Sequence, residues 1–222
     1  MRDATPSWLL PLAIAAIPLV AVHLAWLLST LEGHVPPCIP YLDGCASISR
    51  VARHGSANGL FKLLMVPCAL LQVALWWRAR DWLGSVSVGP RAGASLALLG
   101  AIAGVALCTY VVALGSEGAL YRFMRRYGIT FYFAATYVAQ LVFLRALSQR
   151  VLPQVRAMMP LRGMAAVCVA MLGLGLASVA VSATVTEPDA KDRLENLLEW
   201  YLGLLLTAWF LLHAAAWRRH GS

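Results

Sequence analysis

The segment between positions 43 and 54 contains the side-chain types that nucleophilic catalysis needs. The candidates for an orienting carboxylate, a hydroxyl nucleophile and a general base are Asp43, Ser47, Ser49 and His54. No glycine pattern of a nucleophile elbow surrounds either serine, and the same residue types commonly cap turns and short helices. We therefore expect Asp43 and the two serines to make loop and cap hydrogen bonds, and His54 to lie at the level of the lipid headgroups. A membrane-embedded hydrolase or acyltransferase that acts on lipid is the alternative.

The same segment contains two cysteines, Cys38 and Cys45, in one short loop. Prolines 36, 37 and 40 stiffen its start, and Asp43-Gly44 is a turn signal. In an oxidising compartment a disulfide is plausible, which requires Cα atoms within about 7 Å. The spacing of the two cysteines and His54 matches no zinc pattern, so we expect no metal site. Nothing else in the sequence requires a cofactor.

Two charged residues, Lys62 and Glu199, each lie about one turn inside an apolar segment. An unpaired charge there is costly, so a partner is expected. We expect the two residues to pair with each other, or with Glu195 and arginines of the neighbouring loops.

Three arginines, Arg122, Arg125 and Arg126, alternate with aromatic and aliphatic residues shortly after Glu117. This pattern suits contact with lipid phosphates and also suits pairing with nearby acids. The sequence predicts that the polar residues of this face converge on one ligand-binding site. Its expected members are Lys62, Glu117, Arg122, Arg125, Arg126, Glu195 and Glu199.

The elements that must position these residues are long apolar segments. Hydrophobic residues make up 60% of the 222 residues and charged residues only 13%, with a mean hydropathy of +0.71. Six runs near the length that spans a bilayer cover residues 8–30, 59–77, 93–114, 128–147, 161–184 and 196–217. We predict an all-α integral membrane protein: one polytopic domain, residues 1–222, with about six transmembrane helices and a structured first outer loop.

The chain has a net charge of +8, but its basic residues lie in short loops and form no continuous face. We therefore expect membrane lipids as partners, with room for a membrane-protein partner, and no nucleic acid. A slight excess of basic residues on one side and two aromatic belts favour cytoplasmic termini. Lys62 and Lys191 are the only lysines among 18 lysines and arginines, which is typical of a GC-rich bacterial genome. The expected location is therefore a bacterial inner membrane.

Several residues also resemble a known family: Pro40-Tyr41, Asp43, Gly59-Leu60-Phe61-Lys62 and Glu199-Trp200. On these residues the chain resembles the Frag/DRAM/Sfk family of six-helix membrane proteins. That family includes autophagy modulators, a yeast plasma-membrane lipid regulator and a GPI-anchor lipid-remodelling factor. Eukaryotic members continue Pro-Tyr into Ile-Ser-Asp-Thr-Gly, whereas this chain continues with Leu42-Asp43-Gly44-Cys45. The resemblance implies a lipid-linked or scaffolding role.

Three classes of function follow from these observations. A small transporter is the least favoured, because the chain shows no internal repeat and few deeply placed ionisable residues. An enzyme would need a catalytic arrangement for which no specific motif is present. We expect a membrane protein that associates with lipid, or acts as a scaffold, through the polar cluster on its outer face.

Overall fold

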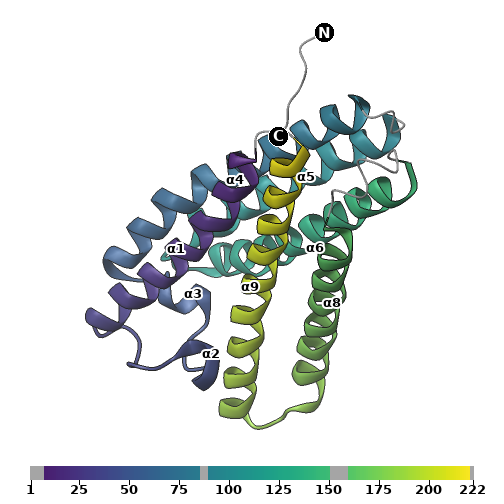
Figure 1. Ribbon diagram of the computed structural model, residues 1–222. Helices are drawn as coiled ribbons and strands as arrows, with labels where there is room; N and C mark the ends of the chain where they lie inside the picture. The colour runs from purple at the N-terminus through teal and green to yellow at the C-terminus, as the bar shows by residue number, and fades with distance from the viewer. Residues whose placement is uncertain (1–7, 86–89, 151–159, 221–222) are drawn as a thin grey trace.

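The structure is a computed structural model that describes residues 8–85, 90–150 and 160–220. Within these ranges all regular secondary structure is helical (Figure 1). Its long helices are α1 (Leu9–Leu31), α4 (Gly55–Ser85), α5 (Pro90–Ala113), α6 (Ala119–Arg150), α8 (Leu161–Thr184) and α9 (Pro188–His220). Each of the six is long and apolar enough to cross a membrane, which is the pattern of a multi-pass membrane protein.

The six predicted segments correspond to these six helices, but three helices are much longer than their apolar runs. The runs at 59–77, 128–147 and 196–217 lie within α4, α6 and α9, which continue through charged residues at their ends. A helix satisfies its backbone hydrogen bonds internally, so it can extend past the apolar core of a membrane. Hydropathy therefore marks the central part of each helix and misses its polar ends.

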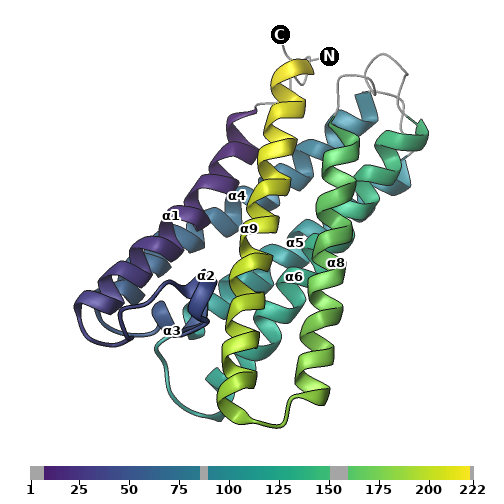
Figure 2. The ribbon, with the colours of Figure 1, turned by 60° about the horizontal axis from the view of Figure 1, so that its bottom comes forward.

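The helices form a ring in which each long helix packs mainly on its neighbours. α1 packs against α4 and α9, α4 against α5, α5 against α6, and α8 against α9, whereas α6 and α8 touch only slightly. The start of α1 and the end of α9 lie at one end of the bundle (Figure 2). The connections 32–54, 114–118 and 185–187 lie at the other end, which we call the loop face.

Aromatic rings fill the half of the bundle away from the loop face. Trp76 of α4, Phe143 of α6, and Trp209, His213 and Trp217 of α9 are fully buried there. The His213 ring lies 4.6 Å from Phe143 and 4.4 Å from Trp217, measured between centroids. Such close packing of rings leaves little free space among these five side chains.

Glu32, which follows α1, connects the loop between α1 and α4 to the first turn of α4 by hydrogen bonds. Its carboxylate accepts hydrogen bonds from the backbone N–H of Ser56, at 3.2 and 3.3 Å, and from the Ser56 hydroxyl. Ser56 is in the first turn of α4, where a negative charge is favourable. The hydrogen bond from the Ser56 side chain is the main reason that the pKa of Glu32 lies below its usual value of 4.5.

This contact predicts an acid-dependent loss of stability. Because folding lowers the pKa of Glu32, its contribution is complete above a pH of about 4.5 and disappears as the pH falls through the lowered pKa. Thermal unfolding in detergent between pH 6 and pH 3 should show a smaller acid-induced drop for Glu32→Gln than for the wild type. Glu195→Gln is the control, since Glu195 makes no hydrogen bond or ion pair within the described residues. An equal drop in Glu32→Gln and wild type would contradict the role of this contact.

Candidate functional site

Residues 38–54, which we call the capping loop, fold into two short helices, α2 (Pro40–Asp43) and α3 (Ile48–Val51). A disulfide joins Cys38 to Cys45, with Cα atoms 6.5 Å apart, inside the limit set from the sequence. Gly44 ends α2 in the left-handed conformation, with φ at 61°. Ser47 starts α3, and its side chain accepts a hydrogen bond of 3.1 Å from the Arg50 N–H. Local sequence signals therefore account for both short helices.

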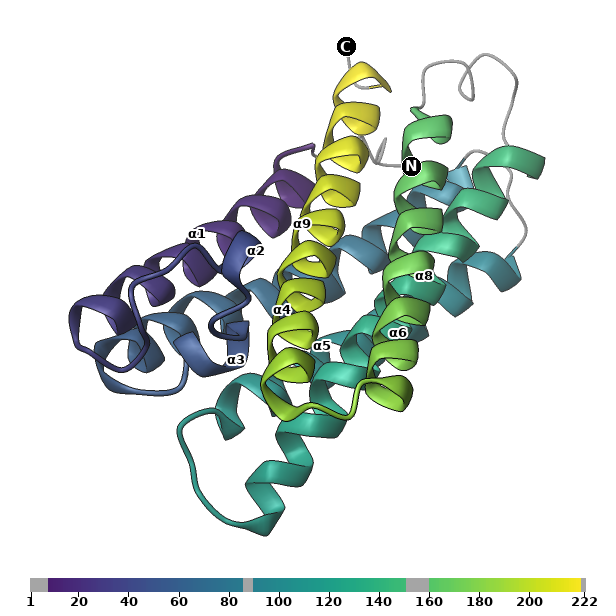
Figure 3. The same ribbon diagram turned by 90° about the horizontal axis from the view of Figure 1, so that it is seen from below.

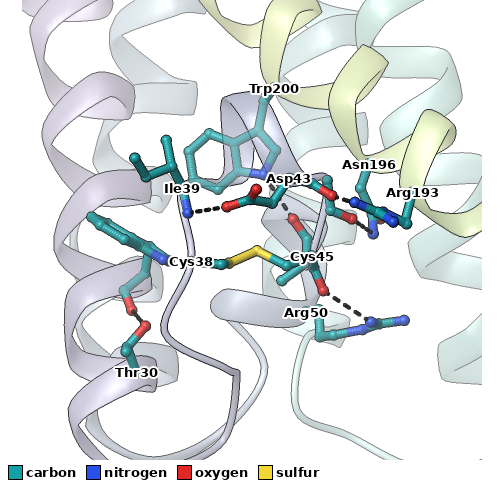
Figure 4. Close-up of a disulfide and its surroundings, with 12 residues drawn as sticks. Thr30, Cys38, Ile39, Asp43, Cys45, Arg50, Arg193, Asn196 and Trp200 are labelled. Atoms are coloured by element: carbon teal, nitrogen blue, oxygen red, sulfur yellow. Dashed lines mark hydrogen bonds between the residues drawn. A yellow bond between two sulfur atoms is a disulfide. The ribbon is translucent and has the colours of Figure 1, made fainter.

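The capping loop is docked on α9 through its own backbone carbonyls (Figure 4). Trp200 donates its indole N–H to Ala46 at 2.8 Å, and Asn196 donates to Gly44 at 2.8 Å. Arg193 donates to the carbonyl of Asp43 at 3.1 Å. A helix as short as α2 cannot satisfy these carbonyls itself, so side chains of α9 do so. Figure 3 shows α2 lying between α1 and α9 as a result.

Tyr41 extends the docked surface toward α1. Its ring centroid lies 5.0 Å from that of Trp200, and the Tyr201 hydroxyl donates to the Tyr41 carbonyl at 3.2 Å. Its own hydroxyl is 3.1 Å from Nε2 of His23. Nδ1 of His23 lies 2.6 Å from the Leu19 carbonyl, which can only accept, so Nδ1 is the donor of that hydrogen bond. The capping loop is thereby attached to α1 as well as to α9.

Glu199 lies beneath the docked loop. Its carboxylate faces the backbone N–H groups of Ile48 and Ser49 at the start of α3, and Arg53 is the basic residue whose charge acts on it. The expected direct pair with Lys62 is wrong, because Lys62 makes no ion pair or hydrogen bond within the described residues. On α4 it is Phe61 that faces inward, and Lys62 projects about 100° further around the helix. Arg53 is close enough for its charge to act on Glu199, but in the part of the chain that the structure describes the two form no ion pair, so the expected pairing with a loop arginine is not formed either.

An apolar cavity of about 70 Å³ lies directly behind Glu199. Five long helices line it, with Ile14, Met65 and Phe133 among the apolar wall residues. On α9 the residues that face it repeat at helical spacing: Glu199, Gly203, Leu206 and Phe210. At roughly 10–15 Å³ per water-sized group, the cavity accommodates about five to seven such groups. We call this space the apolar cavity.

A second, larger cavity of about 410 Å³ opens at the loop face, and we call it the arginine cavity. It lies between the end of the capping loop and the turn that joins α5 to α6. Its lining residues are Arg53, His54, Gly115, Ser116, Glu117, Gly118, Arg122 and Arg125. Arg125 is held in place because its Nη1 donates to the carbonyls of Ala113, at 3.1 Å, and Ser116, at 2.6 Å.

Tyr110, near the end of α5, lies between the two cavities. It lines the apolar cavity, and the charged groups that act on it are Glu199, Arg53 and Arg125. The last two of these belong to the wall of the arginine cavity. Tyr110 and Glu199 line the apolar cavity, Arg53 and Arg125 line the arginine cavity, and the last three act electrostatically on Tyr110; we call these four residues the shared boundary.

The structure brings together part of the predicted ligand-binding set. Glu117, Arg122 and Arg125 line the arginine cavity, and Glu199 lies behind it. The other three members do not join them, and neither cavity is lined by Lys62, Arg126 or Glu195. Arg126 is exposed, one residue further around α6 than Arg125.

Four residues that support the site were not among the sequence candidates: Arg53, Tyr110, Arg193 and Asn196. A helical signal existed for α9, since residues 193, 196 and 200 share one face at intervals of three and four. Arg53 had no such signal, because nothing local distinguishes it from Arg50, which forms an exposed ion pair of 3.3 Å with Asp192.

The residues considered for catalysis act as structural groups in the capping loop. The hydroxyls of Ser47 and Ser49 are hydrogen-bonded to each other at 3.1 Å. Asp43 accepts a hydrogen bond of 2.8 Å from the Ile39 N–H. His54 lies against His34, with ring centroids 5.4 Å apart, and within the described residues it makes no hydrogen bond to Ser47, Ser49 or Asp43. The nucleophile and base of a hydrolase are therefore not assembled in this arrangement.

Comparison with known proteins finds no match among protein-family models, curated proteins or solved structures. Within the part of the chain that the structure describes, no cluster of three histidine, cysteine, aspartate or glutamate residues could hold a metal ion. The two cavities and the capping loop beside them are the features of the described residues that could bind a ligand.

Gly44→Ala should detach the capping loop from α9. A Cβ at this position would lie 2.3 Å from the Arg193 carbonyl oxygen, and the positive φ of 61° adds strain of about 1–3 kcal/mol. Hydrogen exchange in residues 38–54 should be faster than in wild type. Gly33→Ala is a matched control, because φ there is 75° but nothing lies within 4 Å of the added Cβ. Equal exchange in the two variants would show that the close contact with α9 does not hold the loop.

Proposed function

We propose that this chain is a multi-pass membrane protein that binds a membrane lipid, with the end of a hydrocarbon chain in the apolar cavity. The observation that carries the proposal is a cavity walled by five helices that ends at Glu199 and Tyr110 beneath a docked loop. The wall is mainly apolar, its one carboxylate among the described residues lies beneath the loop, and Tyr132 and Thr207 add two hydroxyl groups elsewhere in the wall. The cavity therefore has the polarity of an amphiphile.

The physical reason for a lipid is the composition of the wall. An apolar cavity stays dry in preference to holding water, and it accepts apolar molecules of matching size. In a bilayer the abundant apolar molecule is the acyl chain. The few polar groups at one end would fix the direction in which an amphiphile enters.

The contacts of the capping loop favour a specific lipid-binding site, and not a surface that only touches the surrounding lipid. Its disulfide and its hydrogen bonds to α9 hold Ile48 against the cavity, where Ile48 forms part of the wall. The loop also supplies Arg53 to the polar end. A connecting segment with no role in binding would not need this many fixed contacts.

We also propose that the loop face is the outer face, that both termini are cytoplasmic, and that the membrane is a bacterial inner membrane. A disulfide in the capping loop supports this orientation, because disulfides persist in oxidising compartments outside the cytoplasm. Membership of the Frag/DRAM/Sfk family is a further proposal. Two residues that carry that resemblance, Tyr41 and Trp200, lie in contact at the docked surface.

Native mass spectrometry of the protein purified in mild detergent tests lipid binding. Gly203 lines the apolar cavity, so Gly203→Leu should fill it and reduce the co-purified lipid at least about tenfold. Gly173→Leu is the matched control, since nothing lies within 4 Å of a Cβ on this exposed residue of α8. Equal amounts of co-purified lipid in the two variants, with similar melting temperatures, would contradict the proposal. Wild-type protein that neither retains lipid nor binds added lipid would also contradict it.

A further inference from the structure

We infer that the arginine cavity binds a phosphate-bearing anion, and that this anion is the headgroup of the lipid whose chain occupies the apolar cavity. The inference rests on the proposed function, which places the acyl chain of a lipid in the apolar cavity. It adds the chemistry of the lipid headgroup. It assigns Arg53, Arg122 and Arg125 as the residues that hold the phosphate.

The first support is uncompensated positive charge. Arg53, Arg122 and Arg125 all line the cavity, and the charges of Arg53 and Arg122 act on Arg125, so three like charges surround one cavity. Within the described residues none of the three forms an ion pair with a carboxylate. Glu117 is the single acid in the cavity wall, and Glu199 lies behind Arg53. A bound anion would compensate the excess charge of the wall.

The second support is the supply of unused hydrogen-bond donors. Nε of Arg53 is buried and has no acceptor within the described residues. The two carbonyl acceptors of Arg125 both engage Nη1, which leaves its other guanidinium nitrogens without a protein partner among those residues. Nε of Arg53 is the one buried donor among these nitrogens, and a buried donor without an acceptor is costly. A phosphate offers several charged oxygens both to this donor and to the remaining nitrogens of the Arg125 guanidinium. An anion with several oxygens therefore fits these donors better than chloride does.

The third support is the position and size of the cavity. Arg122 and Arg125 lie in the first turns of α6, beside the exposed aromatic side chains of Phe123 and Tyr127. Exposed aromatic residues at the end of a membrane-spanning helix are typical of the headgroup level of a bilayer. A volume of about 410 Å³ exceeds what an isolated ion needs and is sufficient for a lipid headgroup.

The shared boundary explains why one molecule would occupy both spaces. Tyr110 lines the apolar cavity, and the arginines that act on it line the arginine cavity. A phosphate among the arginines would thus lie next to the polar end of the space that takes the chain. A headgroup with net negative charge is preferred over a zwitterionic one, because a choline cation would be repelled by the same arginines.

The test measures binding of defined probes to the delipidated full-length protein in detergent by thermal shift and titration. The probes are dioleoyl phosphatidylglycerol, dioleoyl phosphatidylcholine, dioleoylglycerol and inorganic phosphate. We expect phosphatidylglycerol to bind about tenfold more tightly than phosphatidylcholine, since charge-assisted hydrogen bonds discriminate by about this factor. Inorganic phosphate should bind more weakly than phosphatidylglycerol, because it lacks the chain.

Arg122→Gln and Arg126→Gln form the matched pair of variants. Both arginines are exposed residues near the start of α6, so neither change should unfold the protein, but only Arg122 lines the cavity. Arg122→Gln should weaken phosphatidylglycerol binding about tenfold and leave dioleoylglycerol binding unchanged. Arg126→Gln should change neither.

The possible failures separate the two proposals. If no lipid binds, dioleoylglycerol included, the lipid-binding function itself is wrong. If the lipids bind equally and Arg122→Gln has no effect, the chain site stands and the phosphate site is wrong. If inorganic phosphate binds as tightly as phosphatidylglycerol, the phosphate chemistry stands and its assignment to a lipid headgroup is wrong.

Discussion

The hydrogen bonds from one face of α9 to the carbonyls of the capping loop are the interaction on which the loop face depends. Asn196 and Trp200 donate to Gly44 and Ala46, which a loop with only two very short helices could not satisfy alone. Glu199 immediately precedes Trp200, so the docking that satisfies the loop also places this carboxylate against α3. The same contacts thus dock the capping loop on α9, position the Glu199 carboxylate and form one end of the apolar cavity.

The division of charge at the loop face follows from this arrangement. Glu199 faces the backbone N–H groups of α3, and Arg53 is the one cavity arginine whose charge acts on it, so Arg122 and Arg125 at the start of α6 are not balanced by this carboxylate. Those arginines keep their charge around a separate cavity. The apolar cavity inside the ring of helices extends to Tyr110, on which the charges of Arg53 and Arg125 act. Apolar space beside positive charge is the feature that an anionic lipid would match.

The sequence predicted the elements better than it predicted their contacts. The six helices follow from apolar runs, and the proximity of Cys38 and Cys45 follows from one short loop. The grouping of Glu117, Arg122 and Arg125 follows from their closeness along the chain. The prediction that Lys62 pairs with Glu199 is wrong. The position of a residue within an apolar segment indicates its depth in the membrane, but which face of a helix turns inward depends on the neighbouring helices. Arg53 was missed because its burial depends on the turn after α5, which is distant in sequence.

The most direct test of the central claim, that a lipid chain occupies the interior of the bundle, is photo-crosslinking with a lipid that carries a diazirine near the end of its acyl chain. The lipid is supplied to cells, and the protein is purified and exchanged into lipid-free detergent before irradiation, so that only retained lipid reacts. Peptide mapping should find the label on interior residues such as Met65, Phe133 and Phe210. Label confined to outward-facing residues of α8, such as Leu172, Leu176 and Val179, would contradict the account.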